Sequence, residues 1–152
     1  MPGRVSAKAV IVNSDGKFLV LTNSYMDIKP HLAYAPDFPG GTLEPGESSE
    51  QAMIREVKEE LGIDLTAAPR KALGQCGSPL LGFSVTMYLV WANVRDVNLG
   101  EEHCMFSWRT LDEMKRMRWW GGYKGLLQKI EHHLMDGSGI EYAEYTEAIS
   151  YA

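Results

Sequence analysis

Residues 40–63 have the sequence GGTLEPGESSEQAMIREVKEELGI, in which a glycine-rich turn leads into a segment dense in carboxylates. Ser48 and Gln51, three residues apart, predict a capping box, with Ser49 as an alternative cap, so we expect a helix to begin near Ser49. Gly62 predicts the left-handed residue that commonly ends a helix. The pattern therefore indicates a helix of about three to four turns directly after the turn.

The predicted helix separates its carboxylates from its apolar side chains. The acidic face, at spacing i, i+3 and i+4, carries Glu56, Glu59 and Glu60. The face expected to turn toward a core carries Ile54, Val57 and Leu61. Like charges at this spacing destabilise a helix by roughly 0.2–0.5 kcal/mol per pair, so we expect a cation to compensate them.

Two kinds of cation can compensate this acidic face. Arg55 lies four residues before Glu59 and can pair with it, but one guanidinium cannot neutralise three carboxylates. A divalent ion such as Mg²⁺ can, because it prefers oxygen ligands and is commonly shared between a few carboxylates and substrate phosphates. The alternative is an ordinary solvated acidic face.

The same residues match a family pattern at every defined position. This pattern consists of Gly41, a gap of five residues, Glu47, a gap of seven residues, and the sequence REVKEELGI at 55–63. It resembles the Nudix box of the Nudix hydrolases. The resemblance implies an α/β fold, the Nudix α/β/α sandwich with a mixed sheet between helices. It also implies hydrolysis of a diphosphate linkage in a nucleotide substrate.

The resemblance further implies a metal site. Its cofactor would be two or three Mg²⁺ ions, with Mn²⁺ as a substitute, which neutralise the anionic linkage and activate water. The expected ligands are the Gly40 carbonyl, Glu56, Glu59, Glu60 and Glu47. Glu47 either reaches this cluster or orients it through Arg55. We expect Arg55, Glu56 and Glu59 to be catalytic, with Arg55 orienting carboxylates.

The resemblance also implies an additional metal-binding or general-base glutamate in the loop at 98–103, which precedes a predicted strand. Glu102 is the first choice and Glu101 the second, although both can be solvated loop carboxylates. His103 can serve as a base or simply cap the next strand. A glutamate of the box is a further candidate for this proton transfer.

An aromatic and proline-rich segment at 23–37 precedes the glycine-rich turn. It is expected to form either a wall for the substrate base or a cover over the core. Tyr25 and Tyr34 are the candidate stacking rings, whereas His31 alone is no ligand signal. Pro79 stands where many ADP-ribose-cleaving members of the family carry proline, so it is a third candidate for substrate binding.

The substrate stays open between a nucleotide sugar such as ADP-ribose and a nucleoside triphosphate. A different class of function is also open, because Nudix domains occur as nucleotide-binding sensors that do not hydrolyse. Such sensors commonly lose the arginine or a carboxylate of the box. Retention of Arg55, Glu56, Glu59 and Glu60 here favours an enzyme.

Further elements are predicted on both sides of the box. Hydrophobic patterning and turn residues predict strands at 4–12, 17–22, 70–76, 82–94 and 105–109. Helices are predicted to begin after Thr110 and to span 123–135. This order of strands and helices indicates a sheet covered by helices on both sides.

Composition bounds the remaining possibilities. The chain of 152 residues is 45% hydrophobic and 23% charged, which is typical of one globular domain over 1–152. The tail at 137–152 is ambiguous between a docking helix, an arm of a homodimer and a frayed end. Two cysteines without CxxC spacing, Cys76 and Cys104, are expected to be buried thiols.

Charge and hydropathy indicate the partners. The net charge of −5 argues against binding a nucleic acid polymer, and no apolar run is long enough to span a membrane. No export signal is evident at 1–10, so a cytoplasmic location is the default expectation. The expected partner is a small nucleotide.

Overall fold

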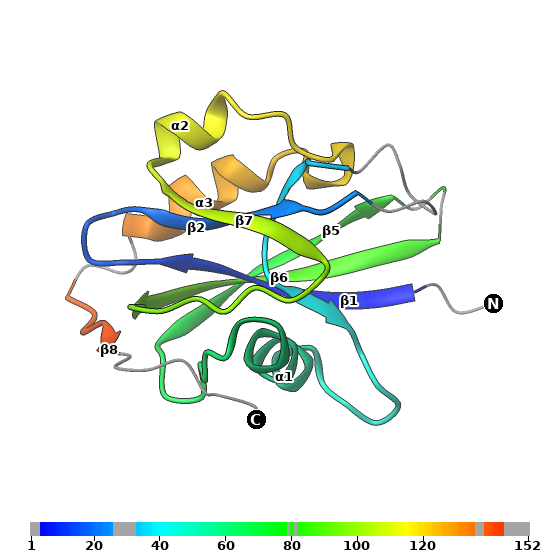
Figure 1. The fold of residues 1–152 in the computed structure, drawn as a ribbon, viewed down its shortest axis with the longest axis horizontal. Coiled ribbons are helices and arrows are strands. Elements are labelled where there is room, and N and C mark those ends of the chain that lie inside the picture. The colour runs from blue at the N-terminus through cyan, green and yellow to red at the C-terminus, as the bar shows by residue number, and fades with distance from the viewer. Residues whose placement is uncertain (1–3, 26–32, 79, 81, 136–138, 145–152) are drawn as a thin grey trace.

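The computed structural model describes residues 4–25, 33–78, 80, 82–135 and 139–144. Within them, eight strands form one mixed sheet, with helix α1 on one face and helices α2 and α3 on the other (Figure 1). The strands are β1 (Arg4–Val12), β2 (Phe18–Asn23), β3 (Pro36–Asp37), β4 (Gly40–Thr42), β5 (Arg70–Ser78), β6 (Phe83–Asn93), β7 (His103–Arg109) and β8 (Ala143–Glu144). The helical elements are α1 (Ser49–Leu61), α2 (Leu111–Lys115), the 3₁₀ turn η3 (Gly121–Tyr123) and α3 (Leu126–Leu134).

Strand β1 organises the sheet. Along one edge it pairs in parallel with β6 from Arg4↔Phe83 to Val12↔Trp91. Along the other edge it pairs with β4 at Ser6–Lys8 and with β2 only at Val12. Strands β1 and β2 therefore diverge, and the chain from β3, which pairs with β2, to β4 fills the opening between them.

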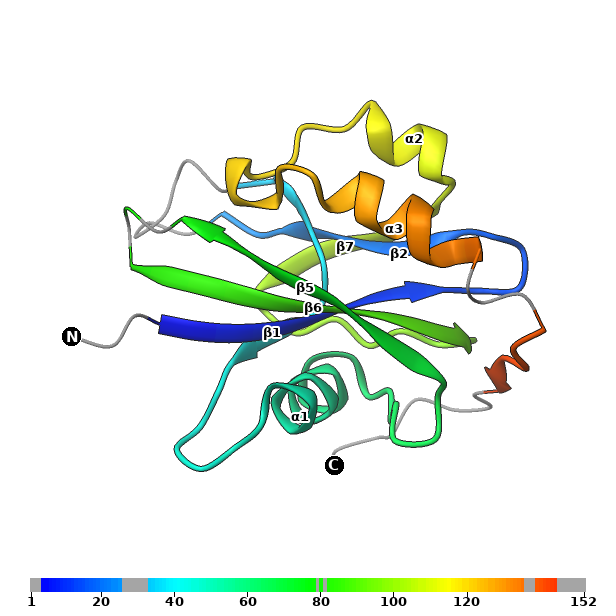
Figure 2. The ribbon, with the colours of Figure 1, turned by 180° about the vertical axis from the view of Figure 1, so that it is seen from behind.

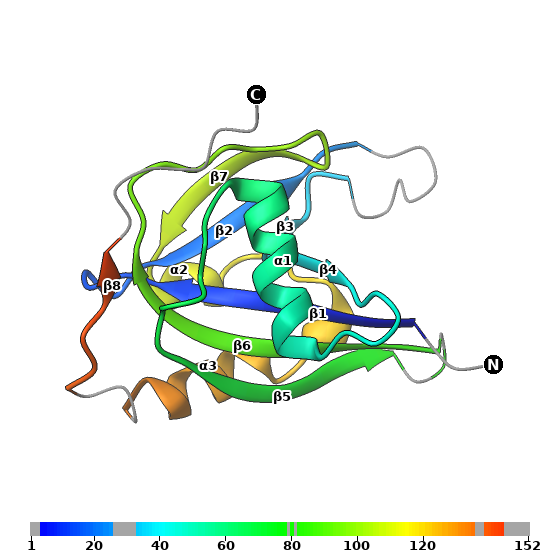
Figure 3. The same ribbon diagram turned by 90° about the horizontal axis from the view of Figure 1, so that it is seen from below.

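Side-chain alternation along β1 divides the core into two layers. Ala7, Ala9 and Ile11 pack with the apolar face of α1, whereas Val10 and Val12 pack on the side of α2 and α3. Figure 3 shows α1 crossing the sheet over β1 and β4, and Figure 2 shows α3 beside β5 on the opposite face. The continuous apolar run of this strand is thus explained by burial on both faces.

The expected strands and the helix after Thr110 are present, with shifted bounds. The helix predicted at 123–135 is divided, because Gly125 adopts a left-handed φ of 81° between η3 and α3. Strand β7 begins two residues early, at His103. Part of the aromatic and proline-rich segment at 23–37 forms β3, since it pairs with Leu21 and Thr22 of β2.

The expectation that both cysteines are buried is wrong. Both are free, but Cys104 is exposed and Cys76 is only partly buried. Cys104 lies on β7, which among the described strands pairs only with β2 and has three exposed residues in succession near its start.

The C-terminal segment is described only in part. Ala143–Glu144 forms the short strand β8, which pairs in parallel with the end of β6. Residues 145–152 lie outside the described residues, so the three alternatives for the tail stay predictions. None of the helices in the described part of the chain is long and apolar enough to cross a membrane.

Candidate functional site

Helix α1 begins and ends where local sequence signals predict. The Ser48 hydroxyl accepts a hydrogen bond from the Gln51 amide at 3.1 Å, and the Gln51 side chain accepts one from the Ser48 amide at 3.0 Å. Ser48, and not Ser49, is therefore the cap. Gly62 ends the helix with a left-handed φ of 73°. These caps fix where the helix begins and ends, and burial of Met53, Val57 and Leu61 fixes which of its faces packs on the sheet.

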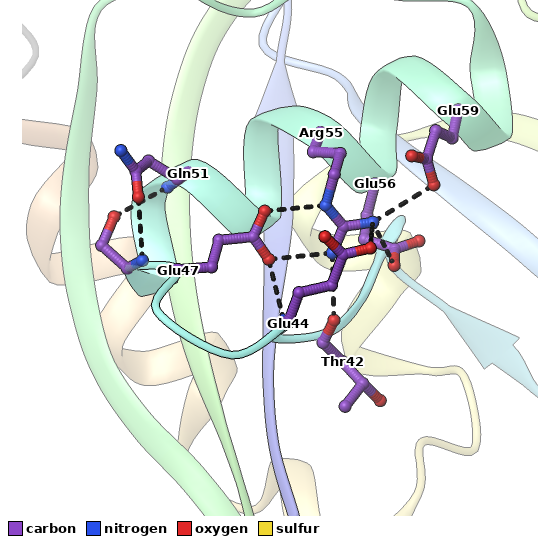
Figure 4. Close-up of polar contacts among 8 residues, drawn as sticks. Thr42, Glu44, Glu47, Gln51, Arg55, Glu56 and Glu59 are labelled. Atoms are coloured by element: carbon purple, nitrogen blue, oxygen red, sulfur yellow. Dashed lines mark hydrogen bonds and ion pairs between the residues drawn. The ribbon is translucent and has the colours of Figure 1, made fainter.

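Arg55 is the centre of the polar network on this helix (Figure 4). Its Nε and Nη2 donate to the two oxygens of Glu47 at 2.7 and 2.9 Å. Its Nη1 donates to Glu56 at 3.0 Å and to Glu59 at 3.2 Å, and Nη2 also donates to the Thr42 carbonyl at 3.2 Å. One planar group therefore joins the glycine-rich turn to two carboxylates of the acidic face.

Glu47 was expected either to reach the carboxylate cluster or to orient it through Arg55. In the structure it binds the guanidinium of Arg55 through both of its carboxylate oxygens. Hydrogen bonds from Arg55, with one from the Glu44 amide, lower the pKa of Glu47 to about 2. Hydrogen bonding to Glu47 and to Glu56 in turn raises the pKa of Arg55 above its ordinary value. The guanidinium and the Glu47 carboxylate are therefore both charged across the physiological range.

Glu60 lies on the inner side of the acidic face, beside the turn. Its carboxylate accepts a hydrogen bond from the Gly40 amide at 3.4 Å. Burial raises the pKa of Glu60 to about 8, and the negative charges of Glu102 and Glu56 add to this shift. The Gly40 amide and Lys8 oppose it only in part. Glu60 is thus a carboxyl group that disfavours ionisation in the absence of a cation.

Gly41 allows the close approach of the helix to the turn. A Cβ atom added at this position would lie 2.6 Å from the carboxyl carbon of Glu56. The carboxylate of Glu56 therefore lies directly against the backbone of the turn, and a larger residue at this position would require that carboxylate to move.

The donor groups fit a divalent cation, although they do not form a finished ligand set. In the described part of the chain, no three His, Cys, Asp or Glu side chains are grouped closely enough to bind one ion. Arg55 Nη1 binds both Glu56 and Glu59 in this arrangement. Mg²⁺ commonly takes only one or two carboxylates and completes its shell with water and phosphate oxygens. A cation beside Glu60 would stabilise its ionised form, which burial and its neighbours disfavour.

The residues proposed as general base lie next to the acidic face. Glu101 and Glu102 are exposed, and the charge of Glu102 is close enough to raise the pKa of Glu60. His103 is only 8% exposed and begins β7. Burial lowers the pKa of His103, although the charges of Asp37 and Glu102 oppose this shift.

The candidate substrate residues are only partly described. Tyr25 and Tyr34 are 56% and 66% exposed, so neither ring covers the core. The Tyr34 amide donates to the Asn23 carbonyl at 2.9 Å, which brings the two ends of the segment together. Pro79 and His31 lie outside the described residues. A role in substrate binding stays a prediction for both tyrosines and for Pro79.

Sequence reasoning missed a polar pair close to this site. Lys8 Nζ lies 2.8 Å from Asp37 Oδ2, and the two side chains are only 17% and 18% exposed. The charge of Lys8 acts on Glu60, and that of Asp37 acts on His103. A single lysine among the apolar residues of 7–12 was the signal that could have indicated this pair.

Two hollows in the described surface lie away from the box. One of about 560 Å³ is bordered by Trp119, Trp120 and Leu127, and one of about 690 Å³ by Arg4, Phe83 and other residues. Neither of these two hollows is lined by a residue of the acidic face. Arg4 nevertheless reaches the turn, because its Nε donates to Thr42 Oγ1 at 3.0 Å.

Comparison with known proteins agrees with this architecture. The family model described as NUDIX domain matches residues 2–130. The 8-oxo-dGTP diphosphatase of Proteus vulgaris is 51% identical over 39 residues, which are 26% of this chain and 35% of that protein. The bis(5'-nucleosyl)-tetraphosphatase (asymmetrical) of Sus scrofa is 33% identical over 106 residues, covering 60% of this chain and 66% of that protein. The matches thus span less than two thirds of either relative.

A solved structure extends the similarity over nearly the whole chain. The MutT protein of Methanosarcina mazei Go1 superposes with a TM-score of 0.70 at 30% identity. The alignment covers 90% of this chain and 96% of that one. The mixed sheet with helices on both faces is therefore a fold that this chain shares with a solved MutT protein.

Proposed function

Because the chain belongs to the Nudix family, we propose that it is a metal-dependent hydrolase that cleaves a diphosphate linkage in a nucleotide. One observation carries the proposal. A single guanidinium, that of Arg55, lies within 3.2 Å of oxygens from Glu47, Glu56 and Glu59. The glycine turn, the arginine and the carboxylates of the box thus form one connected group.

Each residue has a chemical task in this proposal. Glu56, Glu59 and Glu60 would hold Mg²⁺, or Mn²⁺ in its place, and the ion supplies neutralisation of phosphate charge and a lower pKa for water. Arg55 orients Glu56 and Glu59, while Glu47 holds the guanidinium plane in place. Glu102, the exposed carboxylate near Glu60, accepts a proton from the attacking water. The Gly40 amide holds the Glu60 carboxylate in place by a hydrogen bond on the inner side of the site.

We favour a nucleoside polyphosphate over a nucleotide sugar as substrate. The names of the two curated relatives refer to 8-oxo-dGTP and to a bis(5'-nucleosyl) tetraphosphate, each of which carries a chain of phosphates. Tyr25 and Tyr34 have exposed rings, which leaves their faces free to stack on an unpaired base. The two hydrophobic layers share one sheet, so we treat residues 1–152 as one catalytic domain.

A phosphate-release assay tests the proposal. Nucleoside triphosphates, dinucleoside polyphosphates and ADP-ribose are each incubated with Mg²⁺, with Mn²⁺ and with EDTA. We expect turnover that requires the metal and that falls strongly in Glu59→Gln and in Glu60→Gln. Glu131→Gln is the matched control, because this glutamate on α3 pairs with Lys115 and not with the box.

Two outcomes would contradict parts of the proposal. Near wild-type turnover in both box variants would refute the assignment of the carboxylates to the metal. Tight nucleotide binding with no turnover of any substrate would show a sensor domain in place of an enzyme.

A further inference from the structure

A partly buried series of hydrogen-bonded polar groups crosses the opening between β1 and β2. Lys8 of β1 donates to Asp37 Oδ2 of β3 at 2.8 Å. The Tyr123 hydroxyl of η3 donates to Asp37 Oδ1 at 2.5 Å, and the Phe38 amide donates to the same oxygen at 2.8 Å. Three elements that are distant in sequence therefore meet at one carboxylate.

The ionisation states of Asp37 and Tyr123 are well defined. Burial opposes ionisation of Asp37, but the charge and hydrogen bond of Lys8, with the bonds from Tyr123 and Phe38, hold its pKa below the ordinary value. Burial and the charge of Asp37 raise the pKa of Tyr123 well above the ordinary value, so its hydroxyl stays a donor. Asp37 is thus an ionised carboxylate with three donors, which is how a buried charge is accommodated.

This carboxylate fixes the chain segment 37–41, which connects β3 to the glycine turn of the box. The Phe38 ring stacks on Trp119 with centroids 4.8 Å apart and planes inclined by 8°. The Pro39 carbonyl accepts from the Ala9 amide at 2.8 Å. At Gly40, which pairs with Lys8, an added Cβ would collide with the backbone and side chain of that lysine. The segment is therefore held from β1 on one side and from the η3 region on the other.

The end of this segment tolerates little displacement. Gly40 donates to Glu60, and Gly41 lies so close to Glu56 that a single methyl group would collide with the carboxyl group. A shift of the segment would move both contacts at once. Misplacement of a reacting group by about 1 Å can lower a rate by about 100-fold.

We propose that Asp37 and Tyr123 are positioning residues for the box, which hold segment 37–41 in register with Glu56 and Glu60 and do not touch the substrate. The inference rests on the proposed hydrolase function. It means that residues outside the box, on the α2–α3 side of the sheet, influence the position of the box residues.

Tyr123→Phe is the sharpest test, because it removes one hydroxyl and keeps the ring against Phe38 and Trp120. We expect kcat to fall about 10- to 100-fold, while KM stays within about twofold of wild type. Asp37→Asn should act in the same direction. Tyr88→Phe is the matched control, since it also removes one hydroxyl, which bonds to Ser49, from a partly buried tyrosine, and this ring packs in the layer on the α1 side of the sheet.

A second measurement does not depend on turnover. In ¹⁵N-resolved spectra, the amide signals of Gly40 and Gly41 should shift in Tyr123→Phe and stay in place in Tyr88→Phe. If the wild-type protein hydrolyses no nucleotide, the proposed function fails, and these amide signals still decide the positioning role.

Two results would overturn the inference. One is a Tyr123→Phe protein with a lowered melting temperature, wild-type kcat and unmoved glycine signals, which would make the contact purely structural. The other is an increase in KM alone, which would show that the hydroxyl contacts the substrate.

Discussion

The guanidinium of Arg55 binds the carboxylate of Glu47 through two parallel hydrogen bonds, Nε to Oε2 at 2.7 Å and Nη2 to Oε1 at 2.9 Å. Such a fork fixes the plane of the guanidinium as well as its position. The third nitrogen, Nη1, is then directed at Glu56 and Glu59. Glu47 therefore influences the acidic face without being part of it.

Replacing Arg55 by lysine should lower kcat more than it raises KM. An ammonium cannot bind both oxygens of Glu47 in a plane and also reach two further carboxylates, so their orientation is lost while the charge is kept. Steady-state kinetics of Arg55→Lys measure this effect. Arg109→Lys is the control, because Arg109 pairs with Glu113 on the surface at 3.3 Å. A loss of substrate affinity alone would contradict the orienting role.

Gly41→Ala should lose most turnover and keep the fold. The added methyl group would lie 2.6 Å from the Glu56 carboxyl carbon, so the carboxylate or the turn must move. Turnover and circular dichroism measured together separate the two effects. In Gly100→Ala the nearest atom to the new Cβ is the Glu60 carbonyl oxygen at 4.0 Å, so this control should behave as wild type. Full activity of Gly41→Ala would refute the close packing of the turn on the helix.

Glu60 should make the metal-free protein less stable as pH rises. Burial raises the folded-state pKa of Glu60 from 4.5 to about 8, so the folded protein holds a proton that the unfolded chain releases. The resulting stability is fully present below pH 4.5 and is lost as pH increases through about 8. Glu60→Gln should remove this dependence, and so be more stable than wild type above pH 8 by an amount on the order of a few kcal/mol.

Urea unfolding in EDTA between pH 4 and pH 9 measures this difference. Glu59→Gln is the control, because the Glu59 side chain is 56% exposed and should show little of the effect. Added Mg²⁺ should flatten the wild-type profile, since a cation favours the ionised carboxylate. If the free energy of unfolding changes with pH in the same way in wild type and in Glu60→Gln, the burial of this carboxyl group has no energetic consequence.

Tyr34→Ala should raise KM about five- to 150-fold with a smaller effect on kcat, since stacking on a base contributes roughly 1–3 kcal/mol. Its melting temperature should change little, because the ring is 66% exposed. Tyr25→Ala tests the second ring in the same way, and Met135→Ala, an exposed residue after α3, is the control. Unchanged kinetics in both tyrosine variants would place the base-binding site elsewhere.

Local interactions were predictable from the sequence. The capping box of Ser48 and Gln51, the stop at Gly62 and the pairing of Arg55 with Glu59 each join residues within four positions, or depend on one backbone angle. Hydrophobic patterning likewise predicted a strand at 4–12, which the structure contains as β1. Such features depend on residues that are close in the chain in any compact fold, so a pattern suffices to find them.

The sequence also misled where tertiary context prevailed. Patterning favoured one helix over 123–135, but Gly125 breaks it between η3 and α3. Cys104 was expected inside, but β7 leaves this side chain exposed. Propensity and hydrophobicity describe a residue, whereas its exposure depends on which element covers it.

By itself, the sequence determined helix α1, the grouping of three carboxylates on one of its faces and the family to which the chain belongs. Only the tertiary structure decided that Glu60 is partly buried beside Gly40, and that Lys8, Asp37 and Tyr123 meet in one series of hydrogen bonds. Asp37 is separated by 29 residues from Lys8 and by 86 from Tyr123. No local period connects such positions, because their contact exists only once β1 and β2 have diverged and the chain from β3 to β4 fills the opening between them.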